Sequence, residues 1–267
     1  VLDSQLGRRE EAAEAYAAAA GACATYLPAL RALGGRLEAA GDWEGLVRLY
    51  RTEAAAQTDP AVKGERLLRA AEILDRKMGD ADGAIEVLRE AVQGSPGRLA
   101  AVRQLVGLLG RAGLWLETAA VLRDEARRAP DEDQRVEHLK RLADVRENQL
   151  DDPEGAAEAL GGVLLVRPGD SETRWNLVRL SREIGRWEEI VRLREAEAEL
   201  LDDPRAVVAA LYDVGEIREV RMGDPEGAEA TYRAALRIHP GFGPALRALG
   251  RILQADKRWE ELVEMYE

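Results

Sequence analysis

The most constraining feature of this chain is a tryptophan that returns at a fixed interval. Trp43, Trp115, Trp187 and Trp259 follow one another at steps of 72 residues, without an insertion or a deletion between them. A fixed long period is typical of arrays, in which each repeat is a small helical or strand unit that packs on its neighbours. The sequence therefore predicts a repeat architecture before any single element is considered.

A second series divides this period into two unequal repeats. Ala12, Ala84, Ala156 and Ala228 also recur every 72 residues, but out of phase with the tryptophans. The equivalent position in the tryptophan series is Leu46. It lies 34 residues after Ala12 and 38 residues before Ala84. The alternation continues along the chain and predicts repeats of 34 and 38 residues in turn.

Each repeat has the pattern of two helices, and residues 204–240 show it most clearly. Asp203 and Pro204 predict a helix start, because an aspartate caps the free N–H groups and proline suits the first turn. Gly223, followed by an Asp-Pro pair, predicts a break and a second start, and Pro240 predicts the end. No stretch alternates with period two, so we expect no strand and predict an all-α fold of antiparallel helix pairs.

At this point the pattern resembles the tetratricopeptide repeat family. Its marks here are the Leu-Gly pair of the first helix and a Gly, small, aromatic, small and Pro series in the second. The matching residues are Leu33-Gly34, Leu249-Gly250, Gly223, Ala228, Tyr232, Ala235 and Pro240. The resemblance implies an α-α superhelix, or solenoid, spanning 1–267 as a single domain cut from a longer array. It also implies a non-enzymatic scaffold that binds a peptide or partner protein on the concave face of the first helix, helix A.

The chain departs from the family pattern in two ways. The 38-residue repeats carry an extra residue before the second helix, helix B, and the 34-residue repeats have Glu53, Glu125 and Glu197 where a second alanine is expected. The dicarboxylate clamp by which some family members hold an acidic C-terminus is not reproduced, since only Asn176 fits it. Binding of a chaperone tail is therefore not predicted.

Composition narrows the partners and the location. A net charge of -12 argues against nucleic acid, whose binding needs many Lys and Arg, and against an anionic membrane surface. Cys23 is the only cysteine, which fits a reducing compartment, and no apolar run approaches the ~18 residues of a membrane helix. We therefore expect a cytoplasmic protein, and the strong excess of Arg over Lys suggests a bacterial source.

The residues that could carry chemistry are few. His138 lies in a helix A, His239 lies at a helix-ending turn, and no nucleophile motif, phosphate loop or zinc motif accompanies them. Acidic pairs recur in all three 38-residue repeats: Glu72/Asp75, Asp144/Glu147 and Glu216/Glu219. A row of separate pairs suits a solvated or salt-bridged face better than a cation cage. No catalytic residue, cofactor or metal is predicted.

Residues that interrupt the repeat are the better candidates for partner binding, because recurrent residues such as the four spaced tryptophans serve packing between repeats. On helix A, Trp175 interrupts a series of arginines at positions 31, 103 and 247, and other interruptions follow it. The residues of the C-terminal half that we expect to line the groove are Trp175, Asn176, Arg179, Tyr212, Arg247 and Arg251. Arginine and aromatic residues are the types that dominate binding interfaces. An alternative interpretation is that the arginines only bridge acids of adjacent repeats.

Two other functions remain open at this point. The array could self-assemble into a homo-oligomer or filament through its open ends. It could also be the regulatory arm of an enzyme that lies outside residues 1–267.

Overall fold

The computed structural model describes residues 18, 27–94 and 99–266. Fourteen α-helices and two short π-helical segments account for most of these residues, and no strand occurs among them. The predicted all-α array of antiparallel helix pairs is therefore confirmed. Ala12 and Cys23, which were used in the sequence analysis, lie outside the described residues.

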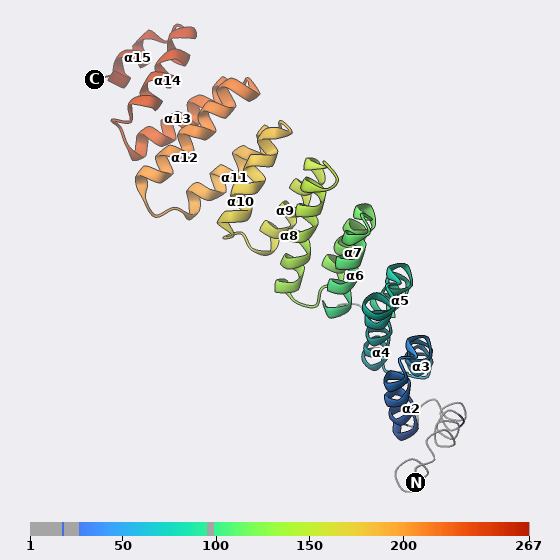
Figure 1. Cartoon of the computed structure of the whole chain (residues 1–267). Helices are drawn as coiled ribbons and strands as arrows, with labels where there is room; N and C mark the ends of the chain where they lie inside the picture. The colour runs from blue at the N-terminus through green and yellow to red at the C-terminus, as the bar shows by residue number, and fades with distance from the viewer. Residues whose placement is uncertain (1–17, 19–26, 95–98, 267) are drawn as a thin grey trace. The chain divides into compact units, whose positions relative to one another are not determined.

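The chain divides into two compact bodies, Val1–Val145 and Arg146–Glu267, and the division falls inside α8. Each body is described by itself, and the single domain expected over 1–267 stays a prediction. The N-terminal body contains α2 Leu27–Ala40, α3 Trp43–Ala55, α4 Pro60–Ile73, η1 Leu74–Met78, α5 Ala81–Gly94, α6 Leu99–Arg111, α7 Trp115–Arg128 and most of α8 Glu132–Asn148 (Figure 1).

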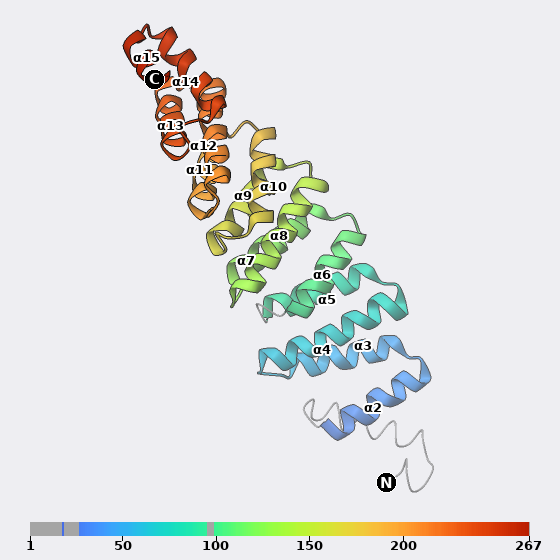
Figure 2. The ribbon, with the colours of Figure 1, turned by 90° about the vertical axis from the view of Figure 1, so that its left-hand side faces the viewer.

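The C-terminal body repeats the same order of helices. It contains the end of α8, then α9 Pro153–Val166, α10 Ser171–Glu183, α11 Trp187–Leu200, α12 Pro204–Ile217, η2 Arg218–Met222, α13 Pro225–Ile238, α14 Gly243–Ala255 and α15 Trp259–Tyr266. Helices α3 and α4 pack side by side in one body, and α12 and α13 do so in the other (Figure 2).

Aspartate side chains start the helices where the sequence predicts. The carboxylate of Asp203 accepts from the N–H of Arg205 at 3.0 Å, and the carboxylate of Asp224 accepts from the N–H of Gly227 at 2.9 Å. These bonds satisfy N–H groups that have no partner within their own helix. Gly223 between the two helices has a φ of 65°, a left-handed conformation that glycine adopts without a steric penalty.

The extra residue of the 38-residue repeats is absorbed in the turn between helices A and B. In the 34-residue repeats the turn closes over five residues, as in the bond from the N–H of Asp42 to the carbonyl of Leu37 at 2.9 Å. In the 38-residue repeats it closes over six, as from Asp224 to Arg218 at 2.8 Å, where η2 forms the last turn of the helix. Both turns keep the N–H of the capping residue hydrogen-bonded, so the repeat lengthens without losing this bond.

The core of the C-terminal body shows why helix A needs a small residue. Tyr232 of α13 is fully buried, and a Cβ atom added to Gly215 of α12 would lie 2.3 Å from its ring. In the two preceding 38-residue repeats the corresponding pairs are Ala71 with Leu88 and Ala143 with Leu160. The larger ring of Tyr232 is therefore accommodated by the smaller residue that faces it.

Candidate partner-binding face of the C-terminal body

The helices of the C-terminal body alternate between two layers. Arg251 of α14 lies 3.2 Å from Glu219 of η2, and Arg179 of α10 lies 2.5 Å from Glu147 of α8, so successive helices A are bridged directly. Arg233 of α13 lies 2.7 Å from Glu261 of α15, which bridges helices B. We call the exposed surface of α10, α12, η2 and α14 the A face.

Ion pairs occupy the recurrent acidic positions. Besides Glu147 and Glu219, Asp75 in the N-terminal body lies 2.7 Å from Arg111, and Glu72 accepts from Gln104 at 3.2 Å. Within the described ranges, no three His, Cys, Asp or Glu residues gather as metal ligands would. At least four of the six recurrent acids therefore take part in side-chain hydrogen bonds or ion pairs, which agrees with the expected solvated or salt-bridged face.

The structure places all six predicted residues on α10, α12 and α14, but in different surroundings. Arg179 and Arg251 form the bridges just described. Tyr212 packs in an aromatic cluster, with ring centroids 5.7 Å from both Tyr232 and Phe242. Asn176 is half-buried, whereas Trp175, Arg247 and Arg251 are largely exposed.

Trp175 replaces one half of an ion pair. In the N-terminal body, Arg103 of α6 donates to Glu137 of α8 at 3.0 Å. Seventy-two residues further along, the same two positions are Trp175 of α10 and Ala209 of α12. Trp175 is 66% exposed and Ala209 is also exposed, so an apolar site stands where the other body has a charged bridge.

The two layers differ in charge. The helices A of the C-terminal body (α10, α12, η2 and α14) carry eight arginines and five acids, a net charge of +3. Its helices B (α9, α11, α13 and α15) carry four arginines and twelve acids, a net charge of -8. Within the C-terminal body, the net charge is therefore positive on the helices A and negative on the helices B.

The four spaced tryptophans each begin a helix B, as predicted, but they are not deeply buried. Trp43, Trp115 and Trp187 are half-buried, and Trp259 is 54% exposed. Lys77 lies over the ring of Trp43 and Arg221 over that of Trp187, each 5.1 Å from the centroid. Their contribution to packing therefore includes cation–π contacts at the surface, and is smaller than full burial of the indole would give.

Two of the three glutamates that depart from the family pattern, Glu53 and Glu125, are buried. Glu53 is 5% exposed and lies 2.9 Å from Arg66. Burial raises the pKa of Glu53, and the charge of Arg66 opposes this shift. In the next such repeat the two positions are Glu125 and His138, which are 1% and 2% exposed. Burial lowers the pKa of His138, and the charge of Glu125 acts in the opposite direction.

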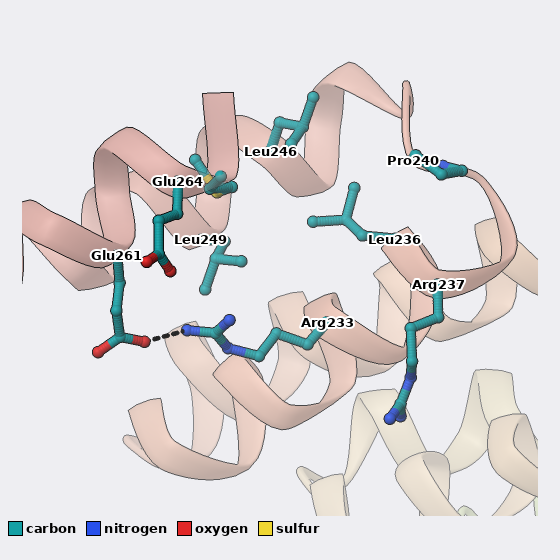
Figure 3. Close-up of a pocket in the computed structure, with 9 residues that line it drawn as sticks. Arg233, Leu236, Arg237, Pro240, Leu246, Leu249, Glu261 and Glu264 are labelled. Atoms are coloured by element: carbon teal, nitrogen blue, oxygen red, sulfur yellow. Dashed lines mark hydrogen bonds and ion pairs between the residues drawn. The ribbon is translucent and has the colours of Figure 1, made fainter. Parts of the chain in front are cut away.

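A pocket of about 480 Å³ opens between α13, α14 and α15 (Figure 3). Apolar side chains from Leu236, Leu246, Leu249 and Met265 line it together with Pro240, and its charged residues are Arg233, Arg237, Glu261 and Glu264. Its volume is in the range of small-ligand sites.

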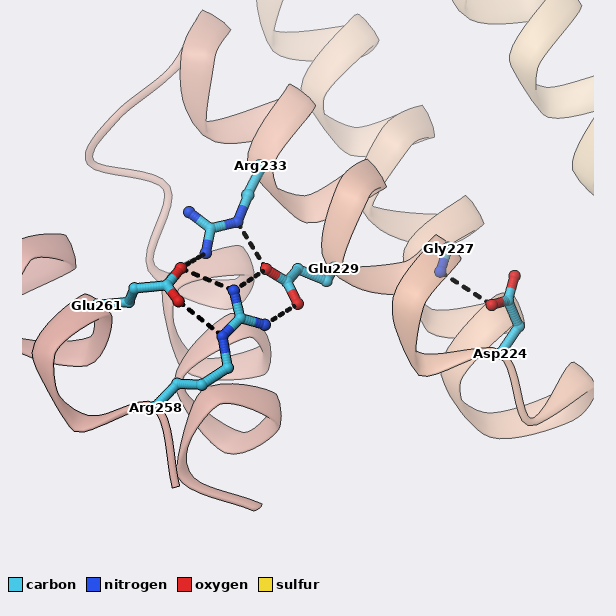
Figure 4. A network of polar contacts seen from close by, with 6 residues as sticks. All are labelled: Asp224, Gly227, Glu229, Arg233, Arg258 and Glu261. Atoms are coloured by element: carbon cyan, nitrogen blue, oxygen red, sulfur yellow. Dashed lines mark hydrogen bonds and ion pairs between the residues drawn. The ribbon is translucent and has the colours of Figure 1, made fainter. Parts of the chain in front are cut away.

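A network of four charged residues adjoins this pocket (Figure 4). Arg258 lies 2.6 Å from Glu229 and 2.7 Å from Glu261, and Arg233 contacts the same two carboxylates at 2.9 and 2.7 Å. The hydrogen bond from Arg258 is the main cause of the lowered pKa of Glu229. Two cations and two anions thus neutralise one another between α13 and α15.

The residues that line this pocket were not among those predicted from the sequence, although one signal points to its repeat position. The residues 72, 144 and 216 positions before Leu246 are Arg174, Val102 and Leu30, so Arg174 is the one that interrupts the series. The prediction considered only exposed positions of helix A, and Arg174 is 8% exposed.

No helix in the described part of the chain is both long and apolar enough to cross a membrane.

Comparison with known proteins agrees with the repeat reading of the fold. A tetratricopeptide repeat family model matches residues 245–267, which include α15 and most of α14. The described residues form an all-α array of helix pairs, and the match to the tetratricopeptide repeat model covers most of its last two helices. No curated protein sequence matches it.

Several solved structures are similar at low identity. The crystal structure of MamA is 18% identical, with 72% of this chain and 88% of that chain covered and a TM-score of 0.35. YrrB, described as a TPR protein with an unusual peptide-binding site, is 17% identical, with coverage of 68% and 90% and a TM-score of 0.36. The C-terminal part of a TPR repeat-containing protein from Cytophaga hutchinsonii is 14% identical, with coverage of 90% and 94% and a TM-score of 0.41.

Proposed function

We propose that this chain is a non-enzymatic scaffold that binds a peptide or partner protein on the A face of its C-terminal body. The observation that carries the proposal is the replacement of the Arg103–Glu137 bridge by Trp175 and Ala209. An indole that is 66% exposed on a helical surface has an unfavourable solvation free energy and adds nothing to the core. Tryptophan is, however, among the residues that contribute most to binding at protein interfaces. Trp175 is the residue we expect a partner to cover.

The charge of the A face supports a partner whose contacting segment is acidic. Arg247, at the same repeat position as Trp175, is exposed and has no ion-pair partner among the described residues. Arg179 and Arg251 are already neutralised by Glu147 and Glu219, so they fix the helices rather than attract the partner. Charge of this kind speeds association and selects among partners more than it adds affinity.

The test restores the bridge that the other body has. The double substitution Trp175→Arg and Ala209→Glu rebuilds the pair seen at Arg103 and Glu137, so the fold should be retained while the apolar anchor is lost. For a partner recovered by affinity capture, calorimetry should show a loss of more than about 2 kcal/mol in binding free energy.

The matched control is Leu165→Ala on α9, which removes an apolar side chain that is 88% exposed on the other layer. It should change the binding free energy by less than about 0.5 kcal/mol. Equal binding by the double variant and the natural chain would reject the A face as the binding surface.

Self-assembly is a second candidate, and exposed side chains of α15 favour it. Trp259, Val263 and Tyr266 are 54%, 56% and 62% exposed, whereas Val191, the counterpart of Val263 on α11, is 5% exposed. Light scattering between micromolar and millimolar chain should then show growing mass, reduced by Trp259→Ser with Val263→Ser. A constant monomer mass over this range would reject self-assembly.

A further inference from the structure

The pocket between α13, α14 and α15 has an internal counterpart that is already filled. Seventy-two residues earlier, the position of Leu246 is held by Arg174, and the position of Pro240 by Pro168. Arg174 is 8% exposed, and its guanidinium donates to the carbonyl oxygen of Pro168 at 2.5 Å. An arginine side chain therefore occupies, within the same chain, the place that stands open beside Leu246.

The surroundings of the open pocket suit the same group. Leu236, Leu246 and Leu249 provide an apolar surface for the methylene groups of an arginine, which pack on such surfaces while the charged end reaches polar atoms. The carbonyl of Pro240 is the counterpart of the acceptor that Arg174 uses. A guanidinium has five N–H donors and can donate hydrogen bonds to a carbonyl and a carboxylate at the same time.

The charges around the pocket leave one acid available. Arg233 and Glu261 belong to the four-residue network in which each charge is matched (Figure 4). Glu264 is exposed and has no ion-pair partner in the part of the chain that the structure describes. The positive charge of Arg237 disfavours the binding of a cation in the pocket, but its side chain extends away from the apolar residues (Figure 3).

We propose that this pocket binds an arginine side chain of a partner polypeptide, with Pro240 and Glu264 as acceptors. The site differs from the A face, since it lies between two helices B and the start of α14. The pocket would recognise a single residue of a partner segment, and this contact alone would bind weakly.

The test uses the methyl group of Met265, which lines the pocket, as the reporter. The chain has three methionines, and Met78 and Met222 lie elsewhere, so they serve as internal controls. N-acetyl-arginine methylamide is titrated into protein with 13C-labelled methionine methyl groups, and the spectrum is assigned with Met265→Leu. We expect a saturable shift of the Met265 resonance alone, and binding at least tenfold weaker for the citrulline analogue, which has the same shape without the charge.

Three variants separate this proposal from a general apolar contact. Leu246→Arg supplies the internal occupant and should abolish the shift, as Arg174 fills the preceding repeat. Glu264→Gln should weaken binding about five- to tenfold, and Arg237→Leu, which copies Leu165 of the preceding repeat, should strengthen it. An unshifted Met265, or equal binding of the arginine and citrulline compounds, would overturn the proposal. Because Glu264 is exposed, its variant stays informative even if Leu246→Arg fails to fold.

Discussion

At the scale of single residues, the histidine that sequence reasoning set aside as non-catalytic is a buried group with a thermodynamic consequence. Burial lowers the pKa of His138 below its ordinary value of 6.5, the charges of Glu125 and Glu137 oppose the shift, and those of Arg141 and Arg103 add to it. The unfolded chain then binds a proton more readily than the folded chain. Stability should fall as the pH drops below about 6.5 toward the folded pKa.

Urea unfolding between pH 7.5 and pH 5.5 tests this expectation. The natural chain should lose free energy of unfolding over this interval by up to about 1.4 kcal/mol for each unit by which the pKa is lowered. His138→Gln should have a shallower dependence on pH, whatever its stability at pH 7.5. Identical slopes for the two proteins would show that His138 does not couple folding to protonation.

The contact between Gly215 and Tyr232 gives a second prediction at this scale. Gly215→Ala should destabilise the chain by about 1–3 kcal/mol through overpacking, even though alanine favours helix. Adding Tyr232→Leu recreates the Ala71–Leu88 pair and should recover part of that loss. A double-mutant cycle by denaturant unfolding should give a coupling energy of about 1 kcal/mol or more, and additive effects would refute the packing argument.

At the scale of helices, the boundaries were the part of the fold that sequence reasoning could reach. Asp-Pro pairs act locally, so the starts of α12 and α13 follow from the residues around Asp203 and Asp224 alone. The sequence shows that this turn is one residue longer than the turn of the 34-residue repeats. It does not show that the turn is closed by η2, because that depends on a hydrogen bond that residue spacing alone does not specify.

The candidate site was less predictable for the same reason. Residue types and interruptions led to Trp175 and Arg179 alike, yet only the positions of Glu147 and Glu183 show that Arg179 is paired while Trp175 is exposed. Side-chain pairing across helices is a property of three-dimensional neighbours. A list of exposed helix positions therefore cannot separate residues that fix the array from residues left for a partner.

A capping substitution tests the local argument. Asp224→Ala removes the acceptor for the N–H of Gly227 and should lower the free energy of unfolding by about 1 kcal/mol. Asp224→Asn keeps an acceptor oxygen and should cost a few tenths of that value. Equal effects of the two substitutions in thermal or urea unfolding would indicate that the cap does not start α13.

At the scale of the whole molecule, the unbroken 72-residue period predicts that deleting one full period leaves the remaining repeats in register. Deleting residues 153–224 joins Asp152 to Pro225 and restores an Asp-Pro-Glu-Gly-Ala sequence at the junction. We expect the shorter chain to remain helical by circular dichroism and to unfold cooperatively with a smaller urea m-value, because less surface is buried.

The control deletes half a period. Removing 153–188 takes out the same kind of helices but places Glu189, inside α11, next to Asp152. It should give a chain with reduced helicity or no cooperative transition. If both deletions behave alike, the 72-residue step does not define how neighbouring repeats pack.

The closed turns between helices A and B also bear on how the chain opens. The N–H groups of Asp80, Asp152 and Asp224 donate hydrogen bonds to carbonyls six residues earlier, at 2.9, 2.8 and 2.8 Å. A backbone hydrogen bond therefore closes each of these three turns. Loops of ordinary proteins exchange their amide hydrogens quickly, whereas a bonded turn between two packed helices exchanges only when both separate. Hydrogen exchange should therefore reveal the helix pairs α4–α5 and α12–α13 each as one opening unit, with slow amides running through the turn.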